Sequence, residues 1–273
     1  MTSARELLER RLADSRLRPF DFRVELEHFT MATWAVAPEK LLPHYDPERF
    51  ELDLVETNDG PRALVSAVSF LNADFRVALA PFAPMVFGQT NYRFYVVDRS
   101  TGEHATWFFG TTLGHDVVHV ARGIFKLPWH SAEYTFETAR DATGRYTRFR
   151  EIVRSEWAPA VYDLVDTGER VTCATAPGYP DEDAMRLRLT HPVTGYFHRA
   201  DDGAVGTYSV WHDYLDLRVA RPRHLRIELF ARLGLVDDAE MARPHSVLIT
   251  PRALFHIHMP PRRVSARSST VSG

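Results

Sequence analysis

The chain has 273 residues, of which 45% are hydrophobic and 25% are charged, the balance of an ordinary globular protein. Its net charge of -3 and the absence of a long basic run argue against a nucleic-acid partner. No apolar stretch is long enough to cross a membrane, and residues 1–18 mix charge with leucine, unlike a signal peptide. The single cysteine, Cys173, excludes an intramolecular disulfide, so we expect a cytoplasmic protein.

The first half of the chain predicts a short helix followed by strands. Residues 3–17 place leucines at near-helical spacing among arginine and glutamate, which predicts an amphipathic helix that ends before Pro19 and serves docking or oligomer contacts. Alternation then predicts strands at 22–29 and 50–55, with a short helix over 38–43 between two prolines. Further strands are expected at 63–72, 90–98 and 106–110.

The second half predicts one interior helix and more sheet. Residues 114–125 carry apolar side chains at helical spacing until Pro128. Residues 132–170 alternate around a turn at Gly144 and predict a meander that continues through 186–189 and 204–219. Strands or short helices are expected at 225–233 and 246–259. We therefore expect an N-terminal helix over 1–21, a single domain over 22–262 and a flexible tail over 263–273.

Four blocks of sequence, taken together, carry a resemblance to a known superfamily. They are residues 33–45 followed by 50–54, residues 90–97 followed by 106–111, residues 120–132, and residues 221–230 with 255–261. In this order they resemble the acetoacetate-decarboxylase-like superfamily, and within it the branch of uncharacterised bacterial relatives. The resemblance implies an α+β, mostly β fold, in which a closed or curled antiparallel β-cone surrounds a cavity and short helices lie outside.

The same resemblance raises the question of the catalytic lysine. The decarboxylases of this superfamily use one lysine of an adjacent pair to form a Schiff base with a β-keto acid. Here the two positions after the corresponding proline are Trp129 and His130. Lys126 lies two residues before that proline, and a register shift would be needed to bring its amine into the cavity. The resemblance therefore implies the fold without the lysine pair, and leaves Lys126 as the one candidate catalytic amine.

Other candidate site residues follow from the same blocks. Arg93 would bind a carboxylate or enolate, and a histidine, His130 or His258, would carry a proton. Two alternatives stay open, because Arg93 on an alternating strand faces either the cavity or solvent, and His130 either faces the cavity or only begins a strand. The remaining candidate substrate contacts are Trp129, Asn91, Tyr95, His256 and Asp213.

Neither a metal nor a nucleotide cofactor is expected. His115 and His119 share a face of the predicted helix, and His256 and His258 share a face of a strand, so both spacings permit zinc. No third ligand can be assigned to either pair, which favours structural histidines. The glycines are scattered singly and form no phosphate-binding loop. As for Asp213, it either orients the adjacent histidine or joins the pocket, since neighbours on a strand cannot both face inward.

Two functions are compatible with these observations. The first is a cofactor-independent enzyme of lyase, dehydratase or cyclase type that acts on a small keto or carboxylated substrate, plausibly in biosynthesis. The second is a non-catalytic small-molecule-binding protein with the same fold. In both cases the expected partner is a small molecule rather than nucleic acid or membrane, and a homo-oligomer is an open alternative. Fold alone does not choose between the two functions.

Overall fold

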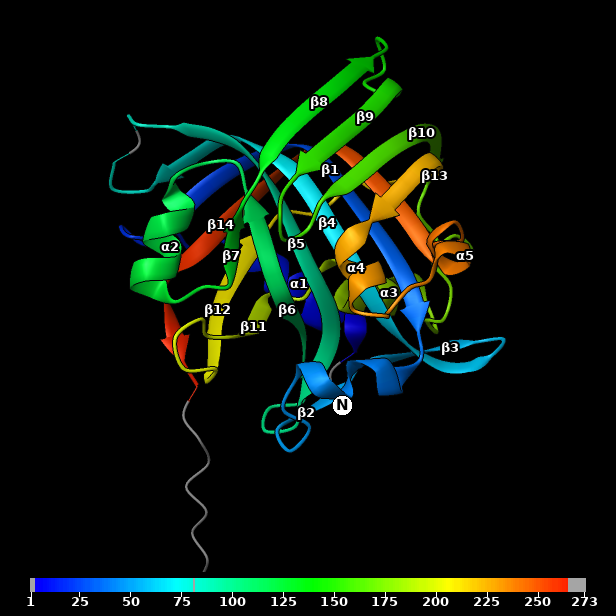
Figure 1. Cartoon of the computed structure of the whole chain (residues 1–273), viewed down its shortest axis with the longest axis horizontal. Helices are drawn as coiled ribbons and strands as arrows, with labels where there is room; N and C mark the ends of the chain where they lie inside the picture. Colours follow the sequence, from blue (N-terminus) through cyan, green and yellow to red (C-terminus); the bar gives the residue numbers. More distant parts are fainter. Residues whose placement is uncertain (1–2, 81, 265–273) are drawn as a thin grey trace, which may run out of the picture.

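Strands dominate the molecule. The computed structural model describes residues 3–80 and 82–264, and within these ranges fourteen strands form a single sheet (Figure 1). The strands are β1 (Phe22–Val36), β2 (Phe50–Leu52), β3 (Leu54–Thr57), β4 (Gly60–Val77), β5 (Met85–Asp98), β6 (Glu103–Leu113), β7 (Trp129–Ser131), β8 (Glu133–Arg140), β9 (Tyr146–Arg154), β10 (Ala160–Arg170), β11 (Thr194–His198), β12 (Val205–His212), β13 (Arg218–Ile227) and β14 (Ser246–Arg263).

The helices are short and lie outside the sheet. They are α1 (Ala4–Ala13), the 3-10 helix η1 (Pro38–His44), α2 (Val117–Phe125), α3 (Glu182–Met185), the π-helical turn η2 (Arg186–Thr190), α4 (Glu228–Arg232) and α5 (Asp238–Met241). Within the described ranges, none of these helices has the length and apolar character needed to cross a membrane.

Seven of the strands close into a ring. From β1 the ladder runs through β4, β5, β6, β11 and β12 to β14, and β14 pairs back with β1. The pairing of β6 with β11 is parallel and the other six are antiparallel. A ring of this kind has no free edge and encloses an interior. The closed β-cone implied by the resemblance is therefore confirmed, with one parallel ladder in its wall.

A second layer of strands covers part of the outer surface of this ring. From β14 the sheet continues through β13, β10 and β9 to β8, and these strands lie across β4 and β5 (Figure 1). The largest core cluster fills the space between the layers and includes Trp34 and Tyr92 from the ring together with Phe149 and Tyr162 from the cover. On β5, alternate side chains therefore face either the ring interior or this core.

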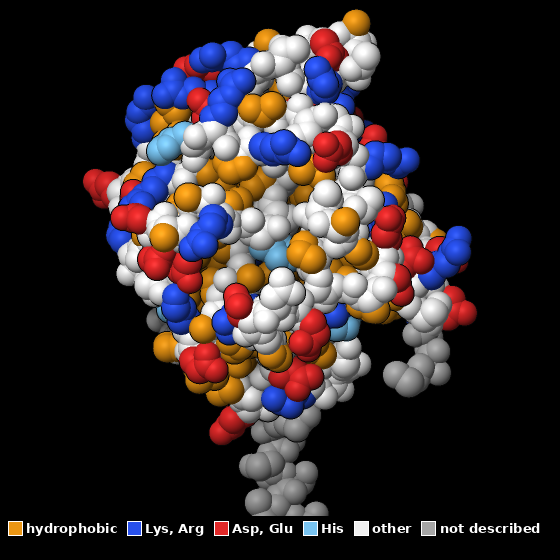
Figure 2. Space-filling model, turned by 90° about the vertical axis from the view of Figure 1, so that its right-hand side faces the viewer, with side chains coloured by type: hydrophobic (Ala, Val, Ile, Leu, Met, Phe, Trp, Pro, Cys, Tyr) orange, Lys and Arg blue, Asp and Glu red, His pale blue; other side chains and the backbone are white. Residues whose placement is uncertain are grey.

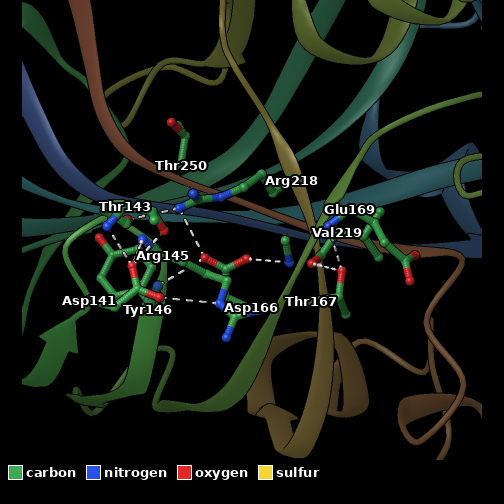
Figure 3. A network of polar contacts seen from close by, with 12 residues as sticks. Asp141, Thr143, Arg145, Tyr146, Asp166, Thr167, Glu169, Arg218, Val219 and Thr250 are labelled. Atoms are coloured by element: carbon green, nitrogen blue, oxygen red, sulfur yellow. Dashed lines mark hydrogen bonds and ion pairs between the residues drawn. The ribbon is translucent and has the colours of Figure 1, made fainter.

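The turn between β8 and β9 is tied down by a buried ion pair (Figure 3). The Asp166 carboxylate lies 2.9 Å from Nη2 of Arg218, which also donates to the carbonyl of Gly144. The same carboxylate accepts the backbone N–H groups of Tyr146 and Gly168. The network thus connects β9, β10 and β13 within the cover.

Helix α1 docks against the rest of this chain. Ser3 caps it, with the reciprocal capping box to Glu6. Arg11 on α1 donates to the carbonyl of His191, and Nε1 of Trp211 donates to the carbonyl of Leu12 at 3.0 Å. The helix ends at Ala13, earlier than the predicted residue 17, because the chain leaves helical geometry at Asp14 and continues to β1 without regular structure.

Two predicted strands differ from the structure. Residues 50–55 form two strands separated at Asp53, whose buried carboxylate binds His104 and Arg188 and so interrupts the ladder. Residues 186–189 form a π-helical turn instead of a strand. There, Asp181 caps α3 and the helical path continues through η2, so that Leu187 and Leu189 are buried although their alternation is typical of a strand. The predicted tail over 263–273 lies outside the described residues from 265 onward.

On the face of the molecule shown in Figure 2, neither positive nor negative charge predominates. Figure 2 shows the side of the molecule that carries β13 and α5, and acidic and basic side chains are interspersed there with hydrophobic ones. This mixture matches the small net charge of -3. This face has no extended region of positive charge, so it gives no reason to expect a polyanionic partner.

Candidate functional site

A cavity of about 180 Å³ lies inside the ring. Side chains from all seven ring strands line it, and α2 with the segment that follows covers one end. Most of the lining is apolar. Within the described chain it includes seven phenylalanines, which are Phe22, Phe29, Phe70, Phe75, Phe108, Phe125 and Phe255. A concave space with a mostly apolar lining and a few polar groups is the usual form of a small-molecule site.

Strand β5 contributes a row of polar side chains to the cavity, including its one charged group among the described residues. Gln89, Asn91 and Arg93 alternate along β5 and all three line the cavity. Nε2 of Gln89 donates to Oδ1 of Asn91 at 3.0 Å, and the hydroxyl of Thr111 donates to the same oxygen at 2.9 Å. These bonds fix the amide groups along one wall, with Arg93 at the end of the row.

Arg93 is the group in this lining that lacks a partner of opposite charge. No carboxylate of the described chain lies within 4.0 Å of its guanidinium nitrogens, and its Nε is buried without a hydrogen-bond partner. Its Nη2 contacts only the sulfur of Met31, at 3.5 Å, and the guanidinium lies 5.5 Å from the centre of the Tyr95 ring. Arg93 is partly buried, and a charge withdrawn from water without a counter-ion is unfavourable, so the site is suited to accept an anion.

A neutral histidine and a protonated tyrosine share the cavity with Arg93. Burial, and to a smaller extent the nearby Arg93, lowers the pKa of His212 to about 4. Nδ1 of His212 lies 2.9 Å from the carbonyl oxygen of Asp213, so this nitrogen carries the proton. Burial raises the pKa of the Tyr208 phenol. At neutral pH the site therefore holds one fixed positive charge, one potential base and one potential acid.

Four predicted contacts lie at or next to the cavity. Arg93, Asn91 and Trp129 line it. Tyr95 is buried just behind Arg93, and its hydroxyl is hydrogen-bonded to Ser66 at 2.9 Å, so the ring supports the guanidinium instead of facing the cavity. Of the two alternatives left open for Arg93, the structure has the one in which its side chain faces the cavity and not solvent. The roles of these residues in binding remain predictions.

His130 and Lys126 are near the cavity but are not among the described residues that line it. Because Trp129 on β7 points inward, His130 points to the opposite side, where its ring stacks on Trp157 with centroids 4.0 Å apart. Lys126 follows α2 in a left-handed conformation, with φ of 57°, and its neighbours Phe125 and Leu127 occupy the lining instead. Of the two alternatives left open for His130, the arrangement here is the one in which it begins a strand outside the lining.

His256, His258 and Asp213 also lie outside the cavity. On β14 the inward positions belong to Phe255, Ile257 and Met259, so both histidines share the outer face. His256 packs on Trp211, and His258 lies 2.9 Å from the carboxylate of Asp21. Asp213 is exposed and holds His212 through its backbone carbonyl.

The histidine pairs do not gather into a metal site. Within residues 3–80 and 82–264, no group of three or more histidine, cysteine, aspartate or glutamate side chains is arranged to hold a metal ion. His115 accepts the backbone N–H of Val117 at the start of α2, which is a structural role.

Sequence reasoning missed several of the polar groups in the cavity, among them Gln89 and Tyr208, and considered His212 only as a partner of Asp213. His212 and Tyr208 alternate with Val210 along β12 and all three face inward. Their alternation was a usable signal, but nothing in the sequence showed which face of β12 lies inside the ring. The same ambiguity applied to β14, where the predicted cavity residues His256 and His258 lie on the outer face.

The sequence itself places the chain in a family. The profile of the family DUF2071, described as an uncharacterized conserved protein, matches residues 23–253. The chain belongs to this family. No protein of curated function matches this DUF2071 chain significantly.

Solved structures of similar fold include two described as acetoacetate decarboxylase or decarboxylase-like. An acetoacetate decarboxylase-like enzyme from Sphingomonas wittichii RW1 is 9% identical, with a TM-score of 0.59 over 92% of this chain and 95% of that one. The enduracididine biosynthesis enzyme MppR complexed with pyruvate is 10% identical, with a TM-score of 0.57 over 92% and 93%. Acetoacetate decarboxylase from Legionella pneumophila is 11% identical, with a TM-score of 0.56 over 95% of each chain. The acetoacetate-decarboxylase-like fold is thus confirmed for the DUF2071 chain, and at identities this low the likeness shows the fold alone.

Proposed function

We propose that this chain is a cofactor-independent enzyme of lyase type that acts on a small 2-oxo or other carboxylic acid held in the ring cavity. The observation that carries the proposal is the partly buried guanidinium of Arg93 in the lining, whose Nε is buried without a hydrogen-bond partner and which has no carboxylate partner among the described residues. A carboxylate would supply two acceptors in the planar geometry that a guanidinium favours, and it would neutralise the charge. The pyruvate complex of a protein with this fold supports the choice of 2-oxo acids as probes.

The chemistry proposed does not use a lysine. The whole chain contains two lysines, Lys40 and Lys126. Lys40 lies on η1, where its amine donates to the carbonyl of Leu235 and pairs with Glu240. Because Lys126 also lies outside the described lining, proton transfer is assigned to His212 and Tyr208 rather than to a Schiff base.

The anion-clamp role is tested by replacing Arg93 with glutamine. We expect Arg93→Gln to raise the Kd for pyruvate and for 2-oxopentanoate at least about tenfold, because it removes a charge-assisted pair of hydrogen bonds. Isothermal titration calorimetry measures both affinities. Arg122→Gln, on the exposed side of α2, is the matched control and should bind both acids like the unaltered protein. Equal affinity in the two variants would contradict the role of Arg93.

Proton transfer is tested by the exchange of the pyruvate methyl protons in D₂O, followed by NMR, because this readout needs no knowledge of the product. We expect the unaltered protein to catalyse the exchange and His212→Ala to slow it at least about tenfold, the lower end of general acid–base contributions. His130→Ala should exchange at the unaltered rate, since His130 stacks on Trp157 away from the lining. Loss of exchange in His130→Ala alone would return the role to that residue.

A second candidate function is a binding protein without catalysis. The observation that favours it is a lining in which the described side chains include no lysine, aspartate or glutamate. Arg93-dependent binding of 2-oxo acids without any proton exchange would support this alternative and contradict the enzyme.

A further inference from the structure

We propose that the ligand of the cavity is a monocarboxylic acid with an uncharged, apolar body of about the size of benzene, such as a branched or linear alkyl chain or an aryl group. This inference rests on the proposed function, since it takes Arg93 as the carboxylate site, and it adds what the rest of the molecule must be. The carboxylate would bind at Arg93, and the body would fill the remaining space toward α2.

The charges of the lining limit the ligand to one anionic group. Arg93 is the only lysine, arginine, aspartate or glutamate among the described residues of the lining. A second carboxylate or a phosphate would find no cation there, and the ammonium group of an amino acid would find no carboxylate. Because an unpaired buried charge is costly, dicarboxylates, phosphorylated compounds and amino acids are disfavoured.

The apolar part of the lining determines the body of the ligand. Seven phenylalanines face the cavity, and α2 contributes Val117, Val120, Ala121 and Phe125. The amides on β5 are already engaged with one another, through the bond of Gln89 to Asn91. A substrate as small and polar as pyruvate would leave most of this apolar surface without contacts, whereas a hydrocarbon body would cover it.

The volume sets the size. An apolar cavity of about 150 Å³ in another protein stays dry and binds benzene. At 180 Å³, the cavity here has room for a body of that size with little to spare. Each methylene that enters the apolar part should therefore tighten binding until the space is full, and longer acids should then bind less well.

The test is the affinity of the unaltered protein for a homologous series, measured by calorimetry. From pyruvate through 2-oxobutanoate to 2-oxopentanoate we expect Kd to fall about fourfold for each added methylene. Oxaloacetate, which carries a second carboxylate, should bind more weakly than 2-oxobutanoate. A Kd that stays constant or rises along the series, or oxaloacetate binding as tightly as 2-oxopentanoate, would overturn the inference.

The direction of the body is tested on α2. Ala121→Phe fills the apolar end, so it should reduce the preference for 2-oxopentanoate over pyruvate at least about fourfold, the contribution of one methylene. Ile124→Phe is the control on the outer face of the same helix, where the native side chain is 68% exposed, and should keep the preference. A preference unchanged in Ala121→Phe would place the body elsewhere and contradict this orientation.

The outcomes separate the two proposals. If pyruvate binds through Arg93 and its longer homologues bind no better, the proposed function is retained and the proposal of a ligand with an apolar body is rejected. If no acid of the series binds, both proposals fail. Because the main series uses the unaltered protein, neither conclusion depends on a variant that folds poorly.

Discussion

Asp166→Ala is expected to lower the free energy of unfolding by about 3–5 kcal/mol, the usual loss when one member of a buried ion pair is removed. Asp166 is fully buried, and the Arg218 side chain opposite it is 17% exposed. The replacement leaves this guanidinium uncompensated and also removes the acceptor of the Tyr146 N–H. Urea-induced unfolding, followed by tryptophan fluorescence, measures the change.

The chain offers a matched control for this experiment. Asp216 pairs with Arg170 at 3.7 Å, but both side chains are more than three-quarters exposed. Asp216→Ala should therefore change stability by less than about 1 kcal/mol. If the two variants lose the same stability, the network of Figure 3 does not stabilise the cover.

Glu151→Gln is expected to remove a large pH dependence of stability. Glu151 lies between the ring and its cover, fully buried, where its Oε1 accepts the hydroxyl of Ser69 and its Oε2 has no partner. Burial raises the pKa of this carboxyl from 4.5 to about 8, with the Ser69 hydrogen bond opposing the shift. At neutral pH the folded protein therefore holds Glu151 protonated.

The sign of the effect follows from the protons bound in each state. Between pH 4.5 and about 8 the unfolded chain has ionised Glu151 and the folded chain has not, so the folded state binds more protons and stability falls as pH rises. The loss is about 1.4 kcal/mol for each pH unit, or roughly 3 kcal/mol between pH 5 and pH 7. The glutamine variant lacks this slope, because its amide does not titrate.

Comparing how the free energy of unfolding changes with pH in the two proteins also separates the titration of Glu151 from any stability change caused by the glutamine amide itself. An amide placed beside Ser69 changes stability by a constant amount at every pH, so only the difference between the two pH profiles carries the result. Urea titrations at pH 5, 6 and 7 give both profiles, and Glu133→Gln, at an exposed position on β8, serves as the control. Parallel profiles for Glu151→Gln and the unaltered protein would show that Glu151 ionises at an ordinary pH.

Much of the fold follows from local patterns in the sequence. Alternation identified the strands that became β1, β4, β5 and β6, and helical spacing up to Pro128 identified α2. The failures have local causes as well. Helical capping by Asp181 overrode an alternating pattern over 186–189, and the ion pairs of Asp53 interrupted a strand.

The site could be predicted only in part, because a strand pattern gives two faces without saying which one is inside. The candidates Arg93 and Trp129 line the cavity, whereas the candidates His130 and His258 lie outside it, and for Arg93 and His130 the sequence had left both faces open. The choice depends on how the ring closes between β1 and β14, which are separated by most of the chain. Pairing between strands so far apart in the sequence is determined by the packing of the whole molecule, so it cannot be predicted from local propensity.

The closed ring has a consequence for the rate at which a ligand exchanges. Hydrogen-bonded ladders join every neighbouring pair in the ring, so the wall offers no gap and a ligand passes only through an end. One end is covered by α2, whose inner side chains are part of the lining. Association should then be slower than a diffusional encounter with an open cleft, and residence times should be long for the affinity measured. Substitutions in α2 would alter both rate constants together, whereas a change at Arg93 would alter mainly the rate of release.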